Sequence, residues 1–461
     1  MKLKPYPEYK DSGVLWLSKI PAHWNIMPLK HWVFINQSVL NENTDPDFRF
    51  NYIDIGAVST GKLVSQPRIE RFADSPSRAR RVIKAGDTLL STVRTYLKAV
   101  YHCKYINKYT VASTGFAVLT PKNNTDPGYV GYVGQSELFI NQIVARSIGV
   151  AYPAISETEL GRCLVWFPTL KEQTQIAKFL DWKTTQINKF IRNKRRLIEL
   201  LKEQKQNIIN QAVTRGLDPN VKLKPSGVDW IGDIPEHWEV CRLKYLLREV
   251  DERSKTGAEY HLSMSQKHGG LVGSSEIKER RLMSENYTGG KLCEYGDIVL
   301  NRLKAHLGIF AHAPCDGVIS PDYSVFRAIS DIEPIYYEYL FCSTVMRPEF
   351  RIRCKGIVEG FWRLYSNDFL SLKVPVPSRE EQLKILDGIR VRFSIIDQAI
   401  TRAEREIELM REYRTRLISD VVTGQVDVRA IEVPDVVEED MLDLEEDPSE
   451  AMDDELEAGE D

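Results

Sequence analysis

The sequence lacks long apolar runs and paired cysteines. No run of eighteen or more apolar residues occurs among the 461 residues, and the opening MKLKPYPEYKDSG has no apolar signal core. The seven cysteines are odd in number and widely scattered, and no CxxC pair is present, which argues against a disulfide framework or a zinc site. We therefore expect a soluble, cytoplasmic protein whose cysteines are reduced.

Common motifs of catalysis and cofactor binding are also missing. The chain has no GxxxxGK(S/T), GxGxxG or HExxH segment, no Asn/Asp-Pro-Pro-aromatic tetrapeptide, and no convincing nuclease cluster of carboxylates and lysine. The eight histidines offer little support for a ligand site, because the pairs His261 with His268 and His306 with His312 lack carboxylate or cysteine companions at ligand spacing. We predict no catalytic residue, no metal site and no cofactor on this chain, so a binding protein is favoured over an enzyme.

The net charge of −3 conceals two regions of opposite charge. Residues 432–461 contain sixteen of the 65 acidic residues and no Lys or Arg. The other 62 basic and 49 acidic residues give the body of the chain a net charge of +13. This surplus indicates a polyanion partner, although it can also be ordinary for a chain of this length. The acidic segment, with few aromatics, predicts a disordered tail.

Two blocks of sequence occur twice. SGVLWLSKIPAHW at 12–24 and SGVDWIGDIPEHW at 226–238 share eight of thirteen residues. Residues 165–218 also align with residues 374–427, without a gap, at a constant offset of 209 residues. A period near 210 residues is far longer than that of solenoid repeats, which indicates the duplication of a whole two-part unit.

The first part of each unit has a mixed pattern. AGDTLLSTV (85–93) and YGDIVLNRL (295–303) are short apolar runs after a Gly-Asp turn, which is typical of the start of a strand. STGFAVLTP (113–121) and SPDYSVFRA (320–328) predict a second matched pair of strands, and SELFI and YEYLFCSTV are typical of helices. We expect a compact α/β region in each unit.

The second part of each unit predicts a long helix. After Pro168 and Pro377, residues 171–213 and 380–422 contain no proline, and each could form a helix of roughly 60 Å. Apolar residues recur at heptad spacing in both, which predicts that the two helices pair along one seam. Residues 171–218 carry a net charge of +6 and residues 380–427 a net charge of −2, so the helices could also pair electrostatically, or the difference could be surface drift.

Two basic residues, Lys205 and Arg414, occupy equivalent positions of the seam. We favour side chains that reach the seam edge, and a contact with a further subunit is the alternative. His23 and His237, inside the repeated IPxHW segments, are interpreted as packed structural residues.

Basic residues collect in the first mixed region. Residues 60–104 contain ten Lys and Arg against three Asp and Glu, with Tyr96 and Tyr101 interleaved. The segments STVRTYLK (91–98) and NRLKAHLG (301–308) align, so Arg94 and Lys304 share a position. Arginine can hold phosphates and can read guanine edges, whereas the alternative is an ordinary solvated loop charge.

A second aligned pair of loops contains aromatic residues. IGVAYPAI (148–155) corresponds to IVEGFWRL (357–364), with Tyr152 opposite Phe361. Core packing and DNA contact are equally compatible with these aromatics. We predict the following DNA-binding residues: Lys62, Arg68, Arg78, Arg80, Arg81, Arg94, Tyr96, Lys98, Arg146, Tyr152, Gln266, Lys267, Arg280, Arg281, Arg302, Lys304, His306, Trp362 and Arg363.

The two-unit layout, the IPxHW segments, the Pro-x-x-x-Glu-Gln lead-in to each helix and the long helices together resemble the specificity subunit of type I restriction–modification systems. The resemblance covers residues 1–427. It implies an α+β fold in which two mixed α/β target-recognition domains are joined by two long antiparallel helices, which form a coiled-coil spacer with a pseudo-two-fold internal duplication. Each domain would read one half of a bipartite double-stranded DNA target.

The resemblance also implies partners. Two methyltransferase subunits would dock on the chain and motor–nuclease subunits would join them, with AdoMet, ATP and Mg²⁺ on those partners and no cofactor on this chain. The acidic tail has no counterpart in the resemblance; it could discourage non-specific DNA binding or provide an accessory contact. A stand-alone nuclease or methyltransferase with unrecognised motifs, or a coiled-coil protein scaffold, are the alternatives.

These inferences give a domain prediction. Residues 1–165 are the first target-recognition domain with a lead-in at 1–24; 166–218 are the first long spacer helix and a connector; 219–375 are the second target-recognition domain with a lead-in at 226–238; 376–427 are the second long spacer helix; and 428–461 are the acidic tail.

Overall fold

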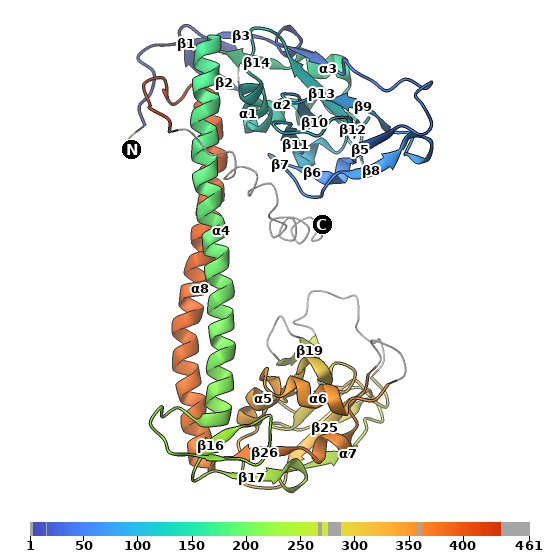
Figure 1. Ribbon diagram of the computed structural model, residues 1–461, viewed down its shortest axis with the longest axis vertical. Helices are drawn as coiled ribbons and strands as arrows, with labels where there is room; N and C mark the ends of the chain where they lie inside the picture. Colours follow the sequence, from blue (N-terminus) through green and yellow to red (C-terminus); the bar gives the residue numbers. More distant parts are fainter. Residues whose placement is uncertain are drawn as a thin grey trace. The chain divides into compact units, whose positions relative to one another are not determined.

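The computed structural model describes residues 3–14, 16–150, 152–265, 270–274, 287–356 and 362–434. It divides into two compact units, Met1–Lys194 with Arg405–Asp461 and Arg195–Glu404. Both units contain sheets and helices, so the fold is α+β (Figure 1). In the described part of the chain, no helix is both long and apolar enough to cross a lipid bilayer.

Unit 1 contains two four-stranded sheets, with strand orders β11-β10-β13-β4 and β8-β5-β12-β9. Neighbours in the first sheet are all antiparallel, whereas β12 pairs in parallel with β5 in the second. The strands are β1 (Tyr9–Val14), β2 (Leu17–Pro21), β3 (Asn25–Pro28), β4 (Val33–Ile35), β5 (Arg49–Ile53), β6 (Val58–Ser59), β7 (Lys62–Leu63), β8 (Arg68–Arg71), β9 (Ala79–Ile83), β10 (Thr88–Ser91), β11 (Val100–His102), β12 (Thr110–Ser113), β13 (Phe116–Pro121) and β14 (Leu164–Phe167).

Unit 1 contains α1 (Pro127–Gln135), α2 (Glu137–Arg146) and α3 (Glu157–Arg162), together with the part of α4 (Leu170–Arg215) up to Lys194. Helix α1 begins at Pro127, where a proline leaves no amide unsatisfied, and the Asp126 carboxylate accepts the Tyr129 amide at 3.0 Å. This helix packs on β10 and β11, and buried Tyr129 and Val130 close that side of the sheet.

The described part of unit 2 contains one four-stranded sheet, of order β18-β25-β22-β23, and several two-stranded sheets. Its strands are β15 (Leu223–Pro225), β16 (Asp233–Pro235), β17 (Glu239–Arg242), β18 (Leu247–Val250), β19 (Leu262–Ser265), β20 (Gly270–Gly273), β21 (Lys291–Cys293), β22 (Ile298–Asn301), β23 (Phe310–His312), β24 (Gly317–Ile319), β25 (Tyr323–Ala328) and β26 (Lys373–Val376). Its helices are α5 (Pro334–Cys342), α6 (Arg347–Arg353), α7 (Ser366–Leu370) and the part of α8 (Arg379–Val422) that precedes Arg405. Eleven buried or half-buried aromatic residues dominate its core, which includes Trp238, Phe310, Phe326, Tyr336, Tyr337, Phe341, Phe350 and Phe369.

The Gly-Asp turns start β10 and β22, as the sequence predicted. Gly86 and Gly296 have φ values of 92° and 84°, a region that glycine occupies without a steric penalty. The following carboxylates close the turns, because Asp87 accepts the Lys84 amide at 2.8 Å and Asp297 accepts the Glu294 amide at 2.8 Å. The predicted second strands are also confirmed as β13 and β25.

The two long helices contact each other within each unit. In unit 1, the first part of α4 faces the last part of α8, where Lys194 Nζ lies 2.6 Å from a Glu406 oxygen and Arg414 donates to Asn188 Oδ1 at 2.7 Å. In unit 2, Lys205 Nζ lies 2.7 Å from Asp397 Oδ1. Partner numbers fall along α8 as they rise along α4, so the helices are antiparallel. The basic seam residues thus bind polar atoms of the facing helix.

Candidate nucleic-acid interface

The first repeated segment fixes the unit 1 domain to the start of α4. The carboxylate of Glu172, in the first turn of that helix, accepts hydrogen bonds from Tyr6 Oη at 2.8 Å and Trp24 Nε1 at 3.2 Å, and it lies 2.8 Å from His23 Nε2. The carboxylate is almost completely buried. The histidine of the IPxHW segment is therefore a structural residue in this unit, as the sequence predicted.

The same attachment recurs at the start of α8. His237 Nε2 lies 2.9 Å from Glu381, so the repeated His–Glu pair has one role in both units. The neighbouring glutamines are buried as well: Gln173 accepts the backbone amide that precedes α1 at 2.8 Å, and Gln382 accepts the amide that precedes α5 at 2.7 Å. The duplicated Glu-Gln pair thus orients both helices of each attachment.

Each mixed region also holds the end of the other long helix. Tyr129 Oη donates to the carbonyl of Val422 in α8 at 3.3 Å, and the equivalent Tyr336 donates to the carbonyl of Val213 in α4 at 3.0 Å. These are terminal carbonyls that lack a partner inside their own helices. The repeated sequences therefore build a frame, and a frame common to both units leaves any discrimination to the segments between them.

One such segment is the turn after β10. Arg94 and Lys98 have φ values of 50° and 53° and flank a single 3₁₀ turn at Thr95–Leu97. Non-glycine residues in this left-handed region are uncommon and cost of order 1 kcal/mol or more each, and they cluster at functional sites. Only four non-glycine residues among those described have positive φ, and two of them lie in this turn.

The second aligned loop lies against this turn. The Arg94 amide donates to the Pro153 carbonyl at 2.8 Å, and the Arg94 guanidinium lies 4.7 Å from the centroid of the Tyr152 ring. Thr95 Oγ1 is bonded to Ser147 Oγ at 2.8 Å, which fixes the base of the turn. The structure therefore places the loops 91–98 and 148–155 in contact, whereas the sequence identified each of them separately as a candidate DNA-binding loop.

The side chains around this contact are unusually apolar for a solvent-facing loop. Tyr96, Leu97, Ile148, Val150 and Tyr152 are each at least half exposed. Exposed apolar side chains that gather in one place indicate an interaction surface. We call the set formed by Arg94, Tyr96, Leu97, Lys98, Ile148, Val150 and Tyr152 the β10 loop surface.

Unit 2 has a counterpart after β22 with different chemistry. The Leu364 amide donates to the Arg302 carbonyl at 3.1 Å, so the equivalent loops again meet. The rings of His306 and Trp362 lie 5.4 Å apart, and the Arg351 guanidinium lies 5.1 Å from the Trp362 ring. Burial and the nearby guanidinium of Arg351 lower the pKa of His306, which favours a neutral imidazole at pH 7.

We call this second set the β22 loop surface; its members are Lys304, His306, Leu307, Arg351, Trp362 and Arg363. Lys304, Leu307 and Arg363 are exposed. Arg302, in contrast, donates through Nε to the Asp322 carbonyl at 2.8 Å and so supports the neighbouring turn.

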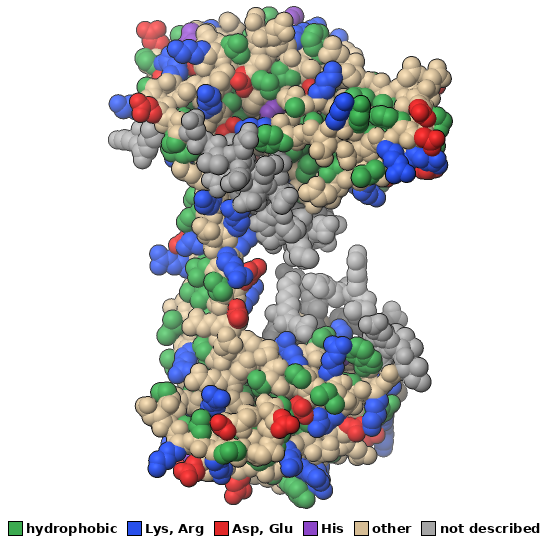
Figure 2. Space-filling model, viewed as in Figure 1, with side chains coloured by type: hydrophobic (Ala, Val, Ile, Leu, Met, Phe, Trp, Pro, Cys, Tyr) green, Lys and Arg blue, Asp and Glu red, His purple; other side chains and the backbone are tan. Residues whose placement is uncertain are grey.

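The predicted arginines of β8 and β9 lie apart from the β10 turn in the second sheet of unit 1. Figure 2 shows Lys and Arg side chains together with carboxylates at the end of the unit formed by β5, β8 and β9. Arg71 is paired with Asp47 and Asp74 at 2.9 and 2.8 Å, and Arg80 lies 5.0 Å from the Phe72 ring. The Nε atom of half-buried Arg81 has no hydrogen-bond partner among the described residues.

The other predicted residues are dispersed. Arg68 and Arg78 are exposed on or beside these strands, and Arg146 ends α2, where it donates to the Gln142 carbonyl at 3.4 Å. Four predicted residues of unit 2 lie outside the described residues: Gln266, Lys267, Arg280 and Arg281.

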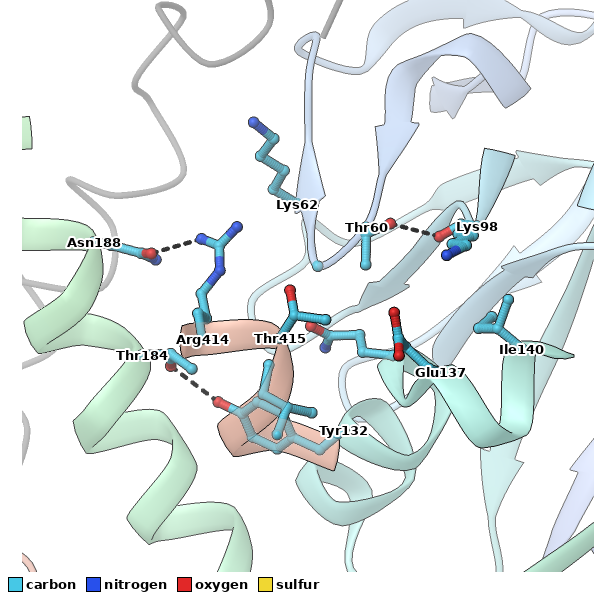
Figure 3. A pocket seen from close by; sticks show the side chains of 13 residues that line it. Thr60, Lys62, Lys98, Tyr132, Glu137, Ile140, Thr184, Asn188, Arg414 and Thr415 are labelled. Carbon is cyan, nitrogen blue, oxygen red and sulfur yellow. Dashed lines mark hydrogen bonds between the residues drawn. The ribbon is translucent and has the colours of Figure 1, made fainter. Parts of the chain in front are cut away.

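Lys62 and Lys98 line a cleft of about 420 Å³ where the unit 1 domain meets α4 and α8. Figure 3 shows Arg414 extended toward Asn188, and Thr60 bonded to the Lys98 carbonyl, at 2.7 and 2.8 Å. Three cationic side chains and one acidic side chain, Glu137, line this space. The cleft therefore has a positive balance on the side of the domain that carries the Lys98 turn.

Sequence reasoning missed Arg351, Leu97, Ile148 and Val150 as members of the two loop surfaces, and it missed Arg414 as a lining residue of the cleft. The signal for Ile148 and Val150 was available, because both lie in the aligned loop that contains Tyr152, and an apolar IGVAYP segment beside a turn is unusual. Arg351 had no such signal, since it lies on α6 and reaches Trp362 only through the fold. Within the described ranges, no group of three His, Cys, Asp or Glu side chains is placed to hold a metal ion.

Comparisons with known proteins give a consistent result, although no family model matches the chain. A Methanocaldococcus jannaschii protein, provisionally named the type I restriction enzyme MjaX specificity subunit, is 24% identical over 437 residues, which cover 90% of this chain and 96% of that protein. The MjaVIII specificity subunit of the same organism is 25% identical and covers 70% and 76% of the two chains. The EcoKI specificity subunit of Escherichia coli K12 is 21% identical and covers 91% and 93%.

Solved structures share the fold. A chain from a study of complex assembly and conformational transition in a type I restriction–modification system matches with a TM-score of 0.65 and 19% identity, covering 88% of this chain and 99% of that chain. The HsdS subunit from Thermoanaerobacter tengcongensis matches with a TM-score of 0.50 and 20% identity, covering 88% and 98%. The curated relatives of this chain are thus type I restriction enzyme specificity subunits, and its fold is that of HsdS.

Proposed function

We propose that this chain is the non-catalytic DNA-recognition subunit of a type I restriction–modification complex. The chain is similar to type I specificity subunits along nearly its whole length. The observation that carries the proposal is a duplicated frame with unlike loops. Both units repeat the Glu–His and Tyr–carbonyl attachments. The aligned turns after β10 and β22 nevertheless differ in their polar and aromatic side chains, with Arg94, Tyr96 and Lys98 opposite Lys304, His306 and Gly308. Two recognition domains with the same attachment but different loop surfaces are expected for a DNA target whose two half-sites differ in sequence.

Residues 1–165 and 219–375 are the proposed target-recognition domains, one for each half-site. The proposed contacts are the nineteen residues predicted from the sequence, of which the β10 and β22 loop surfaces form the best-defined groups. Basic side chains supply phosphate contacts that position a domain, and side chains that reach base edges supply the specificity.

The helices α4 and α8 are the proposed spacer. Residues 166–218 and 376–427 would set the gap between the half-sites as an antiparallel coiled coil, with the duplication related by a pseudo-two-fold axis. A seven-residue insertion lengthens a helix by about 10 Å. Matched heptad insertions in both helices should therefore change the gap in the recognised DNA, and an unchanged gap would contradict the spacer role.

The proposed partners are two methyltransferase subunits, motor–nuclease subunits and double-stranded DNA in the cytoplasm. AdoMet, ATP and Mg²⁺ would belong to the partner subunits. Residues 428–461 are the proposed acidic tail, although residues 428–431 are held against α4, because Gln175 donates to the carbonyls of Val428 and Ile431 at 3.1 and 2.7 Å. Residues 435–461 lie outside the described residues.

The test is a domain exchange in cells that also carry the partner subunits. Methylome sequencing of the wild type should reveal two short half-sites and a fixed gap. Replacement of residues 25–165 by the corresponding region of a relative should change one half-site and leave the other half-site and the gap unaltered. A change in both halves, or in neither, would contradict the modular reading.

The purified chain distinguishes the other functions. DNA cleavage or methylation by the chain alone, without partner subunits, would indicate an enzyme. Binding to DNA should weaken steeply with salt if basic residues contact phosphates, whereas a protein scaffold would show no DNA binding at any salt concentration.

A further inference from the structure

We infer that Arg94 reads a guanine in the half-site recognised by unit 1, and that Tyr152 fixes the plane of the reading guanidinium. This inference rests on the proposed DNA-recognition function and assigns a base to one named contact. Among the charged residues of the β10 loop surface, Arg94 is the one whose side chain and backbone are both held in place by the second loop.

The side chain of Arg94 is available to a ligand. It is exposed, and no carboxylate among the described residues lies within 4.0 Å of its guanidinium. Arg71 in the same unit differs, because Asp47 and Asp74 occupy its donors. The Arg94 Cζ atom lies over the Tyr152 ring, 4.7 Å from its centroid, and this contact leaves the guanidinium N–H groups available to a ligand.

The backbone of Arg94 is also fixed. Its amide is bonded to Pro153, its carbonyl accepts the Leu97 amide at 2.9 Å, and its left-handed conformation is maintained by these contacts. A side chain that is ordered before binding loses less conformational entropy when it binds. The strained backbone at Arg94 and Lys98 therefore has a function in this proposal. It holds the planar guanidinium of Arg94 in a fixed position beyond the end of β10.

Guanine is the base that matches this donor set. Arginine donates two parallel hydrogen bonds to guanine O6 and N7 in the major groove, and it has no acceptor for the amino groups of adenine or cytosine. The exposed apolar side chains beside it, including Ile148 and Leu97, suit the methyl groups and base edges of neighbouring pairs. A phosphate contact would need neither the stacked ring nor the apolar neighbours.

The equivalent position in unit 2 makes the inference specific to one half-site. Lys304 replaces Arg94, its φ is −115°, and the nearby arginine, Arg351, approaches Trp362 from α6. A lysine is a compact charge without the planar fork of arginine. Loss of Lys304 should therefore not affect recognition of the guanine read by unit 1.

The experiment uses the full chain in complex with its methyltransferase subunits, on a target defined by methylome sequencing. Each guanine of the unit 1 half-site, identified by the domain exchange, is replaced singly by 7-deazaguanine, which lacks the N7 acceptor. For the wild type, one position should lower affinity by about tenfold or more. For R94Q, the target affinity should be lower and this position should no longer matter.

Matched variants control the result. R71Q removes an arginine that is already paired with Asp47 and Asp74, and K304Q alters the other unit; both should retain the 7-deazaguanine effect. Y152L should weaken discrimination at the same base pair, whereas Y152F, which keeps the ring, should preserve it. The second half-site shows in every variant whether the complex is folded.

Several outcomes would overturn the inference while leaving the proposed function intact. Two results with the wild-type complex would contradict the assignment of Arg94 to guanine. The unit 1 half-site could contain no guanine, or no 7-deazaguanine substitution could affect binding. Equal weakening on all sequences by R94Q, with a smaller salt dependence, indicates a phosphate contact. Loss of subunit assembly in R94Q indicates a protein-binding surface. If the wild-type complex shows no sequence preference at all, the proposed function itself fails.

Discussion

The carboxylate of Glu172 shows how much one residue can contribute to the frame. Three side chains converge on it, and burial raises the pKa of the Tyr6 hydroxyl, so that group remains a proton donor. Substitution by alanine would leave the Tyr6 hydroxyl and the Trp24 indole without an acceptor. Such orphaned buried donors cost about 1–3 kcal/mol each.

We therefore expect E172A to lower the free energy of unfolding by about 2–4 kcal/mol in urea denaturation followed by tryptophan fluorescence. The control is E381A, at the equivalent position, where the pair with half-exposed His237 is more accessible to water. That variant should lose less than about 1 kcal/mol. Equal losses in the two variants would show that the buried donors around Glu172 do not matter.

A histidine in unit 2 predicts a pH dependence. The hydrogen bond and charge of Glu338 raise the pKa of His312 above 6.5, although burial opposes them. A raised folded-state pKa gives a stabilising contribution that is complete below the unfolded value of 6.5 and disappears as the pH rises through the folded value. Glu333 also faces this group and acts in the same direction.

We expect the melting temperature of the unit 2 transition to fall between pH 6 and pH 8, and E338Q to reduce this dependence. Thermal denaturation at several pH values measures both. H312Q is the matched control, because it removes the titrating group and should abolish the part of the pH dependence that His312 contributes. A wild-type melting temperature that is constant over this range would contradict the assignment.

The residue scale also shows where sequence reasoning reaches its limit. The aligned loops marked Arg94 and Tyr152 as candidate DNA contacts, but the contact between these two residues could not be predicted, because it joins residues 58 positions apart. Arg71 and Arg94 are the same residue type in one basic stretch, yet only the fold shows that Asp47 and Asp74 occupy the former. The basic residues of the sequence predict a charged surface. Only the ion pairs seen in the structure show which of those side chains remain available to a ligand.

At the scale of elements, the long helices were the most predictable feature. The segments 171–213 and 380–422 were expected to be helical, and α4 and α8 span Leu170–Arg215 and Arg379–Val422. The signals are local: a proline before each helix, no internal proline, and apolar residues at heptad spacing. The order of strands within the sheets was not predicted, because pairings such as β12 with β5 join distant segments.

The two helix ends provide a matched comparison. Gly424 and Gly216 follow α8 and α4 with φ values of +75° and +74°, so alanine is strained at both by about 1–2 kcal/mol. Their surroundings differ. A Cβ atom at Gly424 would lie 2.4 Å from Pro21 Cδ and 3.2 Å from Trp24, whereas one at Gly216 would meet Trp238 at 3.5 Å, an ordinary contact.

We therefore expect G424A to destabilise the protein more than G216A, by about 1–3 kcal/mol beyond the shared backbone strain. Urea denaturation of both variants measures the difference, and the shared φ serves as the internal control. Similar losses would mean that the lead-in of unit 1 can move away from α8 at little cost.

At the scale of the whole molecule, charge is divided between the body and the end of the chain. Glu and Asp contribute fifteen charges to residues 435–461, and removing this segment changes the formal net charge from −3 to +12. A protein that binds DNA through phosphates gains affinity for any sequence when its positive charge increases. The same segment could instead contribute an accessory contact, which would have the opposite effect on affinity when removed.

Truncation after Pro434 separates these possibilities. If the tail discourages non-specific binding, the truncated chain in its complex should bind random-sequence DNA several-fold more tightly at about 50 mM salt, and the difference should shrink at about 200 mM as charges are screened. Affinity for the specific target should rise less, so the specificity ratio falls. A tail of equal length with Asn and Gln in place of Asp and Glu should behave like the truncation, because the effect is one of charge. Weaker DNA binding by the truncated complex would instead indicate an accessory contact.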